Sequence, residues 1–331
     1  MKHLSLGIAT CLTTLLLAAC GGGGGGNPDT GGNTPTPVSP TPGSDLLTLD
    51  DSNGGLIAVI ALTNAKGAAS GAMLTGALEL LNAGFAIINA DIQNLGYSGT
   101  EACEVGGEYS WTFTDSDDDA SISSGDSWLV VNNNCETDIA FTNGSTGFSV
   151  TRLETSDTTD EYHADITYSV DLSGTLFGEA SKTLGTYTWK TDTLDGVLQT
   201  NDLFINTYQS IINDEVITVT GLSYVETEDE NTLSESLIMD GELSDETLGD
   251  YSIATQETLL IIDPPFLVSD RYYYQGSYTV TLEKGSVKLT ALSETDVQLD
   301  VDIDGDDVPD QTINTTWGAL ATQYLTHLGI I

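Results

Sequence analysis

Apolar and polar side chains alternate along the chain beyond Gly99. The alternation is clearest in three runs, with apolar residues at Tyr162, Ala164, Ile166, Tyr168, Val170 and Leu172, at Tyr278, Val280 and Leu282, and at Val297, Leu299, Val301 and Ile303. A period of two buries one face of a strand and leaves the other solvated, which is typical of antiparallel sheets. Turn clusters such as Asn143-Gly144 and Lys284-Gly285 separate such runs. We therefore expect a mainly β protein, an antiparallel meander of roughly a dozen strands that forms a large curved sheet, a sandwich or an open barrel.

An earlier segment has a helical period. Between Ala68 and Leu95, apolar residues recur at spacings of three and four, at Leu74, Leu78, Leu81, Phe85, Ile88, Ile92 and Leu95. This stripe predicts an apolar helix within a helical segment at 45–98. We interpret it as a core helix that covers the sheet; a partner-binding or membrane-inserting helix and a coiled coil are the alternatives. A short helix from Trp317 to Leu328 is expected to close the β domain at 99–331.

The first residues have the pattern of an export signal. Lys2 precedes an apolar stretch that is too short to span a bilayer, and Leu17-Ala18-Ala19-Cys20 ends it. This ending resembles the lipobox of bacterial lipoproteins. The resemblance implies a signal peptide at 1–19, cleavage before Cys20, a diacylglyceryl thioether on its sulfur and an acyl chain such as palmitate on its amino group. The alternative is an ordinary cleaved signal with a chance cysteine.

The resemblance also implies a location and a partner. In that family an Asp after the cysteine retains the protein at the inner membrane, whereas Gly21 stands there in this chain. We therefore expect an outer-membrane protein that contacts membrane lipid through its N-terminal acyl chains, on either the periplasmic or the surface side. Residues 20–44 comprise Cys20 and a Gly-, Pro- and Thr-rich stretch, which predicts a flexible tether.

The charge balance excludes some partners. The chain has 331 residues, with 50 acidic and only 8 Lys or Arg side chains, and a formal net charge of −42. Binding to nucleic acid needs basic side chains that replace counterions on phosphates. The composition therefore argues against a nucleic-acid partner and against a polybasic membrane patch.

The four cysteines divide into two groups. Cys11 lies within the signal and Cys20 carries the expected lipid, which leaves Cys103 and Cys135. An even pair in an oxidising compartment predicts a disulfide. A metal-binding or nucleophilic cysteine is the alternative, but neither a CxxC motif nor a neighbouring His supports it.

The chain beyond Cys103 also resembles uncharacterised β-rich lipoproteins of Gram-negative bacteria. The shared features are a Gly-rich tether, a region of paired-cysteine hairpins, and a terminal acidic loop followed by a Trp-containing segment. The resemblance implies an architecture but no activity.

That terminal loop is the best candidate for a metal site. Its candidate ligands are Asp300, Asp302, Asp304, Asp306 and Asp310. Carboxylates at every second position around a turn glycine can wrap a hard cation, and the run resembles the calcium loops of thrombospondin type 3 and dockerin-like modules. The ligand positions of such a calcium loop can be aligned with this sequence starting at Asp300 or at Asp302, and in neither alignment are all the positions filled by the usual residues. We expect a structural calcium ion here; a solvated acidic hairpin tip is the alternative.

Two weaker candidates remain. A second acidic loop tip, with Asp115, Asp117, Asp118 and Asp119, could bind a cation in the same way, but it lacks a turn glycine. Tyr272, Tyr274 and Tyr278 share one face by parity and could hold sugar rings or apolar ligands; packing against neighbouring strands is the alternative.

We identify no catalytic motif in the sequence. Gly125-Asp126-Ser127 and Asp160–His163 resemble the first and last blocks of GDSL-type esterases, but those enzymes are α/β and their blocks lie further apart. We expect a lipid-anchored, non-catalytic outer-membrane binding or envelope-structural module. The alternatives are a calcium-dependent surface adhesin or glycan binder, a periplasmic hydrolase that uses a carboxylate pair, and a carrier of apolar ligands.

Overall fold

The computed structural model describes residues 46–89 and 98–331, except 120, 139, 157–160, 177–178, 196, 213–214, 230 and 263–271. The side chains of 74–89, 176, 179, 212, 215 and 262 are also outside the description. The expected signal, Cys20 and the tether at 20–44 therefore lie outside the described residues.

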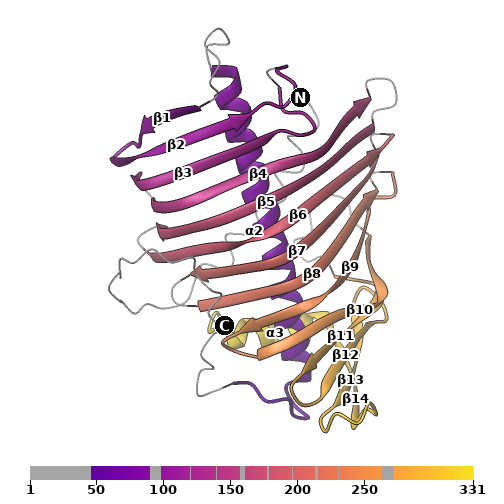
Figure 1. Ribbon diagram of the computed structural model, residues 1–331. Coiled ribbons are helices and arrows are strands. Elements are labelled where there is room, and N and C mark those ends of the chain that lie inside the picture. Colours follow the sequence, from indigo (N-terminus) through magenta and orange to yellow (C-terminus); the bar gives the residue numbers. More distant parts are fainter. Residues whose placement is uncertain are drawn as a thin grey trace.

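The described residues form one open sheet of fourteen strands in chain order, with every neighbouring pair antiparallel. Figure 1 shows the strongly twisted sheet and its two free edges, β1 and β14. The strands are β1 (Ser98–Ala102), β2 (Gly106–Thr114), β3 (Ser127–Glu136), β4 (Ala140–Ser156), β5 (Glu161–Leu176), β6 (Glu179–Leu194), β7 (Leu198–Ile212), β8 (Glu215–Asp229), β9 (Ser234–Asp245), β10 (Gly249–Ile262), β11 (Gln275–Leu282), β12 (Ser286–Ala291), β13 (Asp296–Asp302) and β14 (Gln311–Thr316). The expected mainly β meander is confirmed, in its open-sheet form.

The alternation divides the two faces of the sheet. In β5, Ile166 and Tyr168 are 3% and 1% exposed, whereas Thr167 and Ser169, which alternate with them, are exposed. The buried face carries the helix α2 (Gly54–Asn89), and we call it the helix face; the opposite side is the outer face.

One of the two expected turns is wrong. Lys284-Gly285 does form the turn between β11 and β12, where Gly285 has a φ of +85°. Asn143-Gly144 instead lies inside β4. Gly144 has a φ of +111°, and a Cβ there would collide with the carbonyl oxygen of Asp171 on β5. The glycine permits a close strand approach rather than a reversal of the chain.

The scarce basic residues help to set the register on the outer face. Arg152 pairs across the sheet with Asp165, Asp165 with Lys190, and Lys190 with Asp202. Opposite charges directly across from each other stabilise a strand pair, and a shift by one residue would move the whole row to the buried face. This row of four residues, the outer charge ladder, alternates in sign across β4 to β7, while the ion pair of Arg152 itself is with Glu154 of its own strand.

The helix α2 crosses the strands on the helix face (Figure 1). Gly54 lies against Val301 of β13, and further along the helix Gly71 lies against Tyr208 of β7. Among the described side chains of α2, at 54–73, the fully buried ones are Ile57, Ala58, Ala61, Ala65, Ala69 and Ala72. Small side chains allow the helix to approach the sheet closely, and they make α2 part of the core, as expected.

The helix α2 begins earlier in the chain than the apolar stripe indicated. The stripe predicted a helix from Ala68, but α2 begins at Gly54. The segment Gly54–Met73 is also long and apolar enough to cross a membrane, with a mean hydropathy of 1.3, yet 56% of its most apolar 18-residue stretch is buried inside the protein. The side chains of the predicted stripe from Leu74 onward lie outside the described residues.

The expected C-terminal helix is present as α3 (Trp317–His327). Thr316 caps it, because its Oγ1 accepts a hydrogen bond of 3.1 Å from the N–H of Ala319. Leu320 packs against the start of α2, where a Cβ on Gly55 would lie 2.5 Å from Leu320 Cδ2. The two helices therefore meet at a close contact, and a larger residue at Gly55 would force the Leu320 side chain to move.

The predicted disulfide between Cys103 and Cys135 is confirmed. The two Cα atoms are 5.4 Å apart, within the usual range for a disulfide. Cys103 follows β1 and Cys135 lies near the end of β3, so the bond fastens the β1 edge of the sheet across β2.

Candidate functional site

The loop between β13 and β14 brings three carboxylates together. Oxygen atoms of Asp302, Asp304 and Asp310 lie within 4.8 Å of one another. Asp302 is only 4% exposed, and its two oxygens accept hydrogen bonds from the N–H groups of Gly305 (2.8 Å) and Asp307 (2.9 Å). These bonds fold the loop back over the end of β13, which directs the carboxylates toward one another.

Two of the five predicted ligands do not join this group. Asp300 accepts hydrogen bonds from Gln298 and Thr312, and Asp306 accepts one from the N–H of Val308. The alignment that starts at Asp302 therefore fits better than the alignment that starts at Asp300. The physical reason is the strand period, since Asp300 lies on the outer face of β13 beside strand neighbours.

The three acids repel one another. The pKa of Asp304 is raised, first by the charge of Asp306, then by partial loss of solvation and by the charges of Asp310 and Asp302. A hard cation with oxygen ligands would relieve this repulsion. The three carboxylates are therefore close enough together to hold a metal ion.

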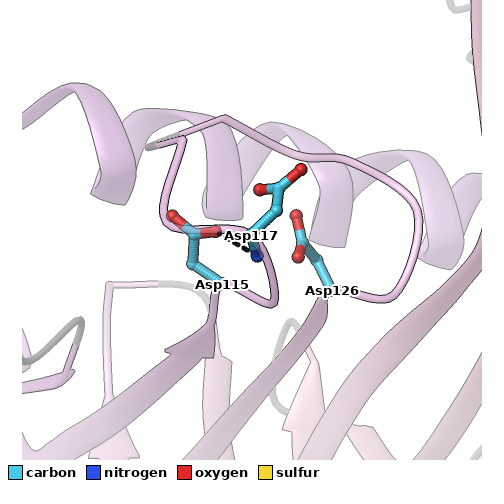
Figure 2. Close-up of side chains that lie close together, drawn as sticks. All are labelled: Asp115, Asp117 and Asp126. Carbon is cyan, nitrogen blue, oxygen red and sulfur yellow. Dashed lines mark hydrogen bonds between the residues drawn. The ribbon is translucent and has the colours of Figure 1, made fainter.

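A second acidic group lies in the loop between β2 and β3. Figure 2 shows the carboxylates of Asp115, Asp117 and Asp126 facing one another, with oxygen atoms within 4.8 Å. Asp115 and Asp117 belong to the expected acidic tip. The sequence pattern did not predict Asp126 as part of this acidic group, because the fold of the loop, rather than a short spacing, brings it to Asp115 and Asp117.

Asp126 has a structural task in this loop. It is fully buried, and its carboxylate accepts hydrogen bonds from the N–H groups of Ser116 (2.8 Å) and Ser123 (2.6 Å). The pKa of Asp117 is raised, first by loss of solvation and also by Asp119 and Asp115, although a hydrogen bond from Ser123 lowers it. Backbone donors thus already hold part of this group in place.

The three tyrosines do not form one exposed face. Tyr278 is fully buried, and its hydroxyl donates a hydrogen bond of 2.9 Å to the carbonyl oxygen of Ala58 on α2. Tyr272 and Tyr274 precede β11, where strand parity no longer applies. Tyr272 stacks on Trp317, with ring centroids 5.8 Å apart. The expected ligand surface is therefore wrong for Tyr278, which is buried, and Tyr272 packs on Trp317, whereas Tyr274 stays half-buried.

The structure also reveals a cluster of charges between α2 and the sheet, formed by Lys66, Glu226 and Glu235. Lys66 Nζ donates a hydrogen bond of 3.0 Å to the Tyr273 hydroxyl and lies 3.7 Å from Glu235 Oε1. Burial raises the pKa of Glu226 to about 7, with further contributions from Glu235 and Glu228 that exceed the lowering effect of Lys66. The sequence did contain a signal, because Glu226 and Glu235 continue the alternation of the buried residues Tyr224 and Leu237.

A carboxylic acid with a pKa near 7 is chemically suited to proton transfer. Glu226 and Glu235 are diagonal neighbours on β8 and β9, and the charge of Glu235 adds to the effect of burial in raising the pKa of Glu226. Lys66 of α2, however, interacts with both acids. The pair therefore faces a helix of the same chain, which does not favour the alternative of a carboxylate-pair hydrolase.

The residues that resemble esterase blocks have other partners. His163 Nδ1 contacts Asp192 Oδ1 on β6, and Asp126 binds the N–H groups of its own loop. Asp160 lies outside the described residues. The structure therefore gives these residues roles in strand pairing and loop folding.

Comparisons with known proteins assign no family. A scan against protein-family models finds no match, and neither a search of curated proteins nor a search of solved structures returns a match.

Proposed function

We propose that this chain is a lipid-anchored, non-catalytic module of the outer membrane, which offers the outer face of its sheet for binding or for structural contacts in the envelope. The anchor rests on the lipobox-like ending at Cys20 and on the tether that follows it. The acyl chains would hold the protein at the membrane, and the tether would give the sheet reach. The partner, a protein or a glycan, is left open.

The observation that carries the proposal is the outer face of the sheet. The helix α2 lies across the helix face, whereas the outer face carries mostly polar side chains and the outer charge ladder. Strands of 12 to 17 residues from β4 to β10 make this face broad. A rigid, hydrogen-bonded surface of this size suits docking, and the strong negative charge of the chain favours a partner that complements acidic groups.

The proposed lipid anchor can be tested at Cys20. We expect the wild-type chain, expressed in a Gram-negative host with a labelled palmitate analogue, to carry the label and to sediment with the outer membrane. A Cys20→Ser variant is expected to lose the label and the membrane association, because the sulfur that carries the diacylglyceryl group is gone.

Cys11→Ser is the matched control, since Cys11 lies in the segment that is removed. This variant is expected to behave as the wild type does. Label that persists in Cys20→Ser, or a wild-type chain recovered without label in the soluble fraction, would refute the lipid anchor.

The Asp302 group favours a second candidate function, a calcium-dependent surface adhesin or glycan binder. Calcium bound there would stiffen the β13–β14 hairpin at one free edge of the sheet. We expect millimolar calcium to raise the melting temperature of residues 45–331 relative to EDTA, since a ligand that binds only the folded state stabilises it. An Asp302→Asn/Asp304→Asn variant is expected to melt at the same temperature in both conditions.

Asp307→Asn provides the control for charge. It removes one negative charge from the same loop, outside the group of three, and asparagine tolerates the φ of +65° at this position. This variant should keep the calcium response. Overlaid melting curves for the wild type in calcium and EDTA would show that the loop is only a solvated acidic turn.

A further inference from the structure

Two glutamates stand in apolar rows on the helix face. Glu226 follows Tyr224 in the alternation of β8, and Glu235 precedes Leu237 in that of β9. Tyr224 is 1% exposed and Leu237 is fully buried. The register pairs Glu226 with Leu237 and Glu228 with Glu235, so the two acids are diagonal neighbours on the same face. The chain therefore places carboxyl groups where an apolar side chain would suit the core.

Lys66 of α2 joins these acids to the helix. Its ammonium group lies 3.7 Å from Glu235 Oε1, donates to the Tyr273 hydroxyl at 3.0 Å and sits 5.4 Å from the centre of the Tyr273 ring. The Tyr224 hydroxyl donates to Glu226 Oε1 at 3.3 Å. The Lys66 and Glu235 side chains are 35% and 16% exposed, so protons and water can reach the group. These contacts connect α2, β8, β9 and the segment before β11.

The remaining neighbours determine the charge balance. Glu228 on β8 adds negative charge. In the adjacent strands, β7 places Asn201 opposite Glu226, and β10 places Ile261 opposite Glu235. Neither side chain carries a charge. Lys66 is thus the cation that the named contacts provide for the two acids.

We propose that Lys66, Glu226 and Glu235 form a proton-dependent clasp that holds α2 against β8 and β9. With Glu226 protonated, the two acids carry a single negative charge and Lys66 balances it. Loss of that proton leaves two carboxylates, with Glu228 beside them, against one ammonium group. The repulsion between neighbouring carboxylates then weakens the attachment of the helix.

The direction of the pH dependence follows from proton binding. Burial raises the pKa of Glu226 from 4.5 to about 7 in the folded chain. The folded state therefore holds this proton more tightly than the unfolded state does. The stabilisation is fully present at pH values below the pKa of Glu226 in the unfolded chain, and it is lost as the pH rises through about 7.

Thermal melts of the purified full chain between about pH 5 and about pH 9 test the clasp. We expect the melting temperature of the wild type to fall by roughly 2–8 °C across the upper half of this range. Glu226→Gln mimics the protonated acid without changing its size. This variant is expected to match the wild type at the acid end and to melt at a higher temperature than the wild type at the alkaline end.

Glu242→Gln separates the clasp from general charge repulsion, because Glu242 is an exposed residue on the same strand as Glu235. Its melting temperature should follow the wild-type pH profile. The proposal is overturned if Glu226→Gln keeps the wild-type profile, or if Glu242→Gln removes the alkaline loss equally well.

A second variant tests the contribution of the helix. Because the charge of Lys66 lowers the pKa of Glu226, Lys66→Met is expected to shift the midpoint of the alkaline loss to higher pH. After correction for intrinsic exchange rates, the protection of the α2 backbone amides should fall with rising pH in the wild type but not in Glu226→Gln. An unchanged midpoint in Lys66→Met, or α2 exchange that responds equally in both chains after correction for intrinsic rates, would contradict a clasp.

Discussion

Replacing Trp317 by alanine is expected to lower the free energy of unfolding by about 3–5 kcal/mol. Trp317 is 5% exposed and begins α3 beside the last strand of the sheet. Its ring stacks on Tyr272 with an angle of 4° between the ring planes and lies against Tyr273 at a centroid distance of 6.2 Å. The substitution would leave a cavity between α3 and the segment that leads into β11. Urea denaturation of the wild type and the variant measures the effect.

A hydrogen bond adds to the loss. The indole Nε1 of Trp317 donates to the carbonyl oxygen of Tyr273 at 2.8 Å, and both groups are buried. Removing the donor leaves the carbonyl oxygen without this partner, which is costly in an apolar environment. Because the Tyr273 hydroxyl accepts a hydrogen bond from Lys66, the same change is expected to loosen α2 as well.

Two substitutions serve as comparisons for Trp317→Ala. Trp317→Phe keeps an aromatic ring but loses the donor, so its expected cost is about 1–3 kcal/mol. Leu328→Ala removes an apolar side chain that is 41% exposed just beyond α3, and its effect should stay within about 0.5 kcal/mol. A loss of less than about 1 kcal/mol for Trp317→Ala would mean that this end of the chain is not docked as described.

The strands were predictable because their signal is local. A strand such as β5 buries every second side chain, so the run from Tyr162 to Leu172 already contains the pattern that the fold uses. The Asn143-Gly144 error has a physical basis. Asn-Gly suits tight turns, but glycine also serves where two strands approach closely, and only the neighbour Asp171 distinguishes the two cases.

The start of α2 was hidden by its small side chains. A helix whose buried face is made of Ala58, Ala61 and Ala65 shows little contrast between faces, so the prediction relied on the larger residues from Leu74 onward. The close contact that these alanines permit depends on the sheet, which the local sequence does not reveal. The overall helical segment was predicted, but its boundary was not.

The candidate sites also differ in whether the local sequence reveals them. Asp302, Asp304 and Asp310 are close in sequence, and the loop pattern pointed to them directly. Asp126 joins its group through the fold of a long loop, and Lys66 meets Glu235 only because α2 crosses β9. Contacts between distant segments require the strand order and register, which no local pattern specifies.

The disulfide carries the other large expected effect. A Cys103→Ala/Cys135→Ala variant is expected to lose about 3–4 kcal/mol of unfolding free energy, because the bond closes a loop across a separation of 32 residues and restricts the unfolded chain. That loop contains β2 and the acidic group with Asp115 and Asp126. Chemical denaturation of the oxidised wild type and the double variant measures the loss.

The bond also secures the structure at the β1 edge. β1 has only five residues and pairs with β2 alone, so few backbone hydrogen bonds hold it in the sheet. Reducing agent should lower the stability of the wild type to that of the double variant and leave the variant unchanged. If instead the oxidised wild type and the variant unfold at the same denaturant concentration, the disulfide contributes nothing to stability. The pairing of β1 with β2 would then have to account for the edge by itself.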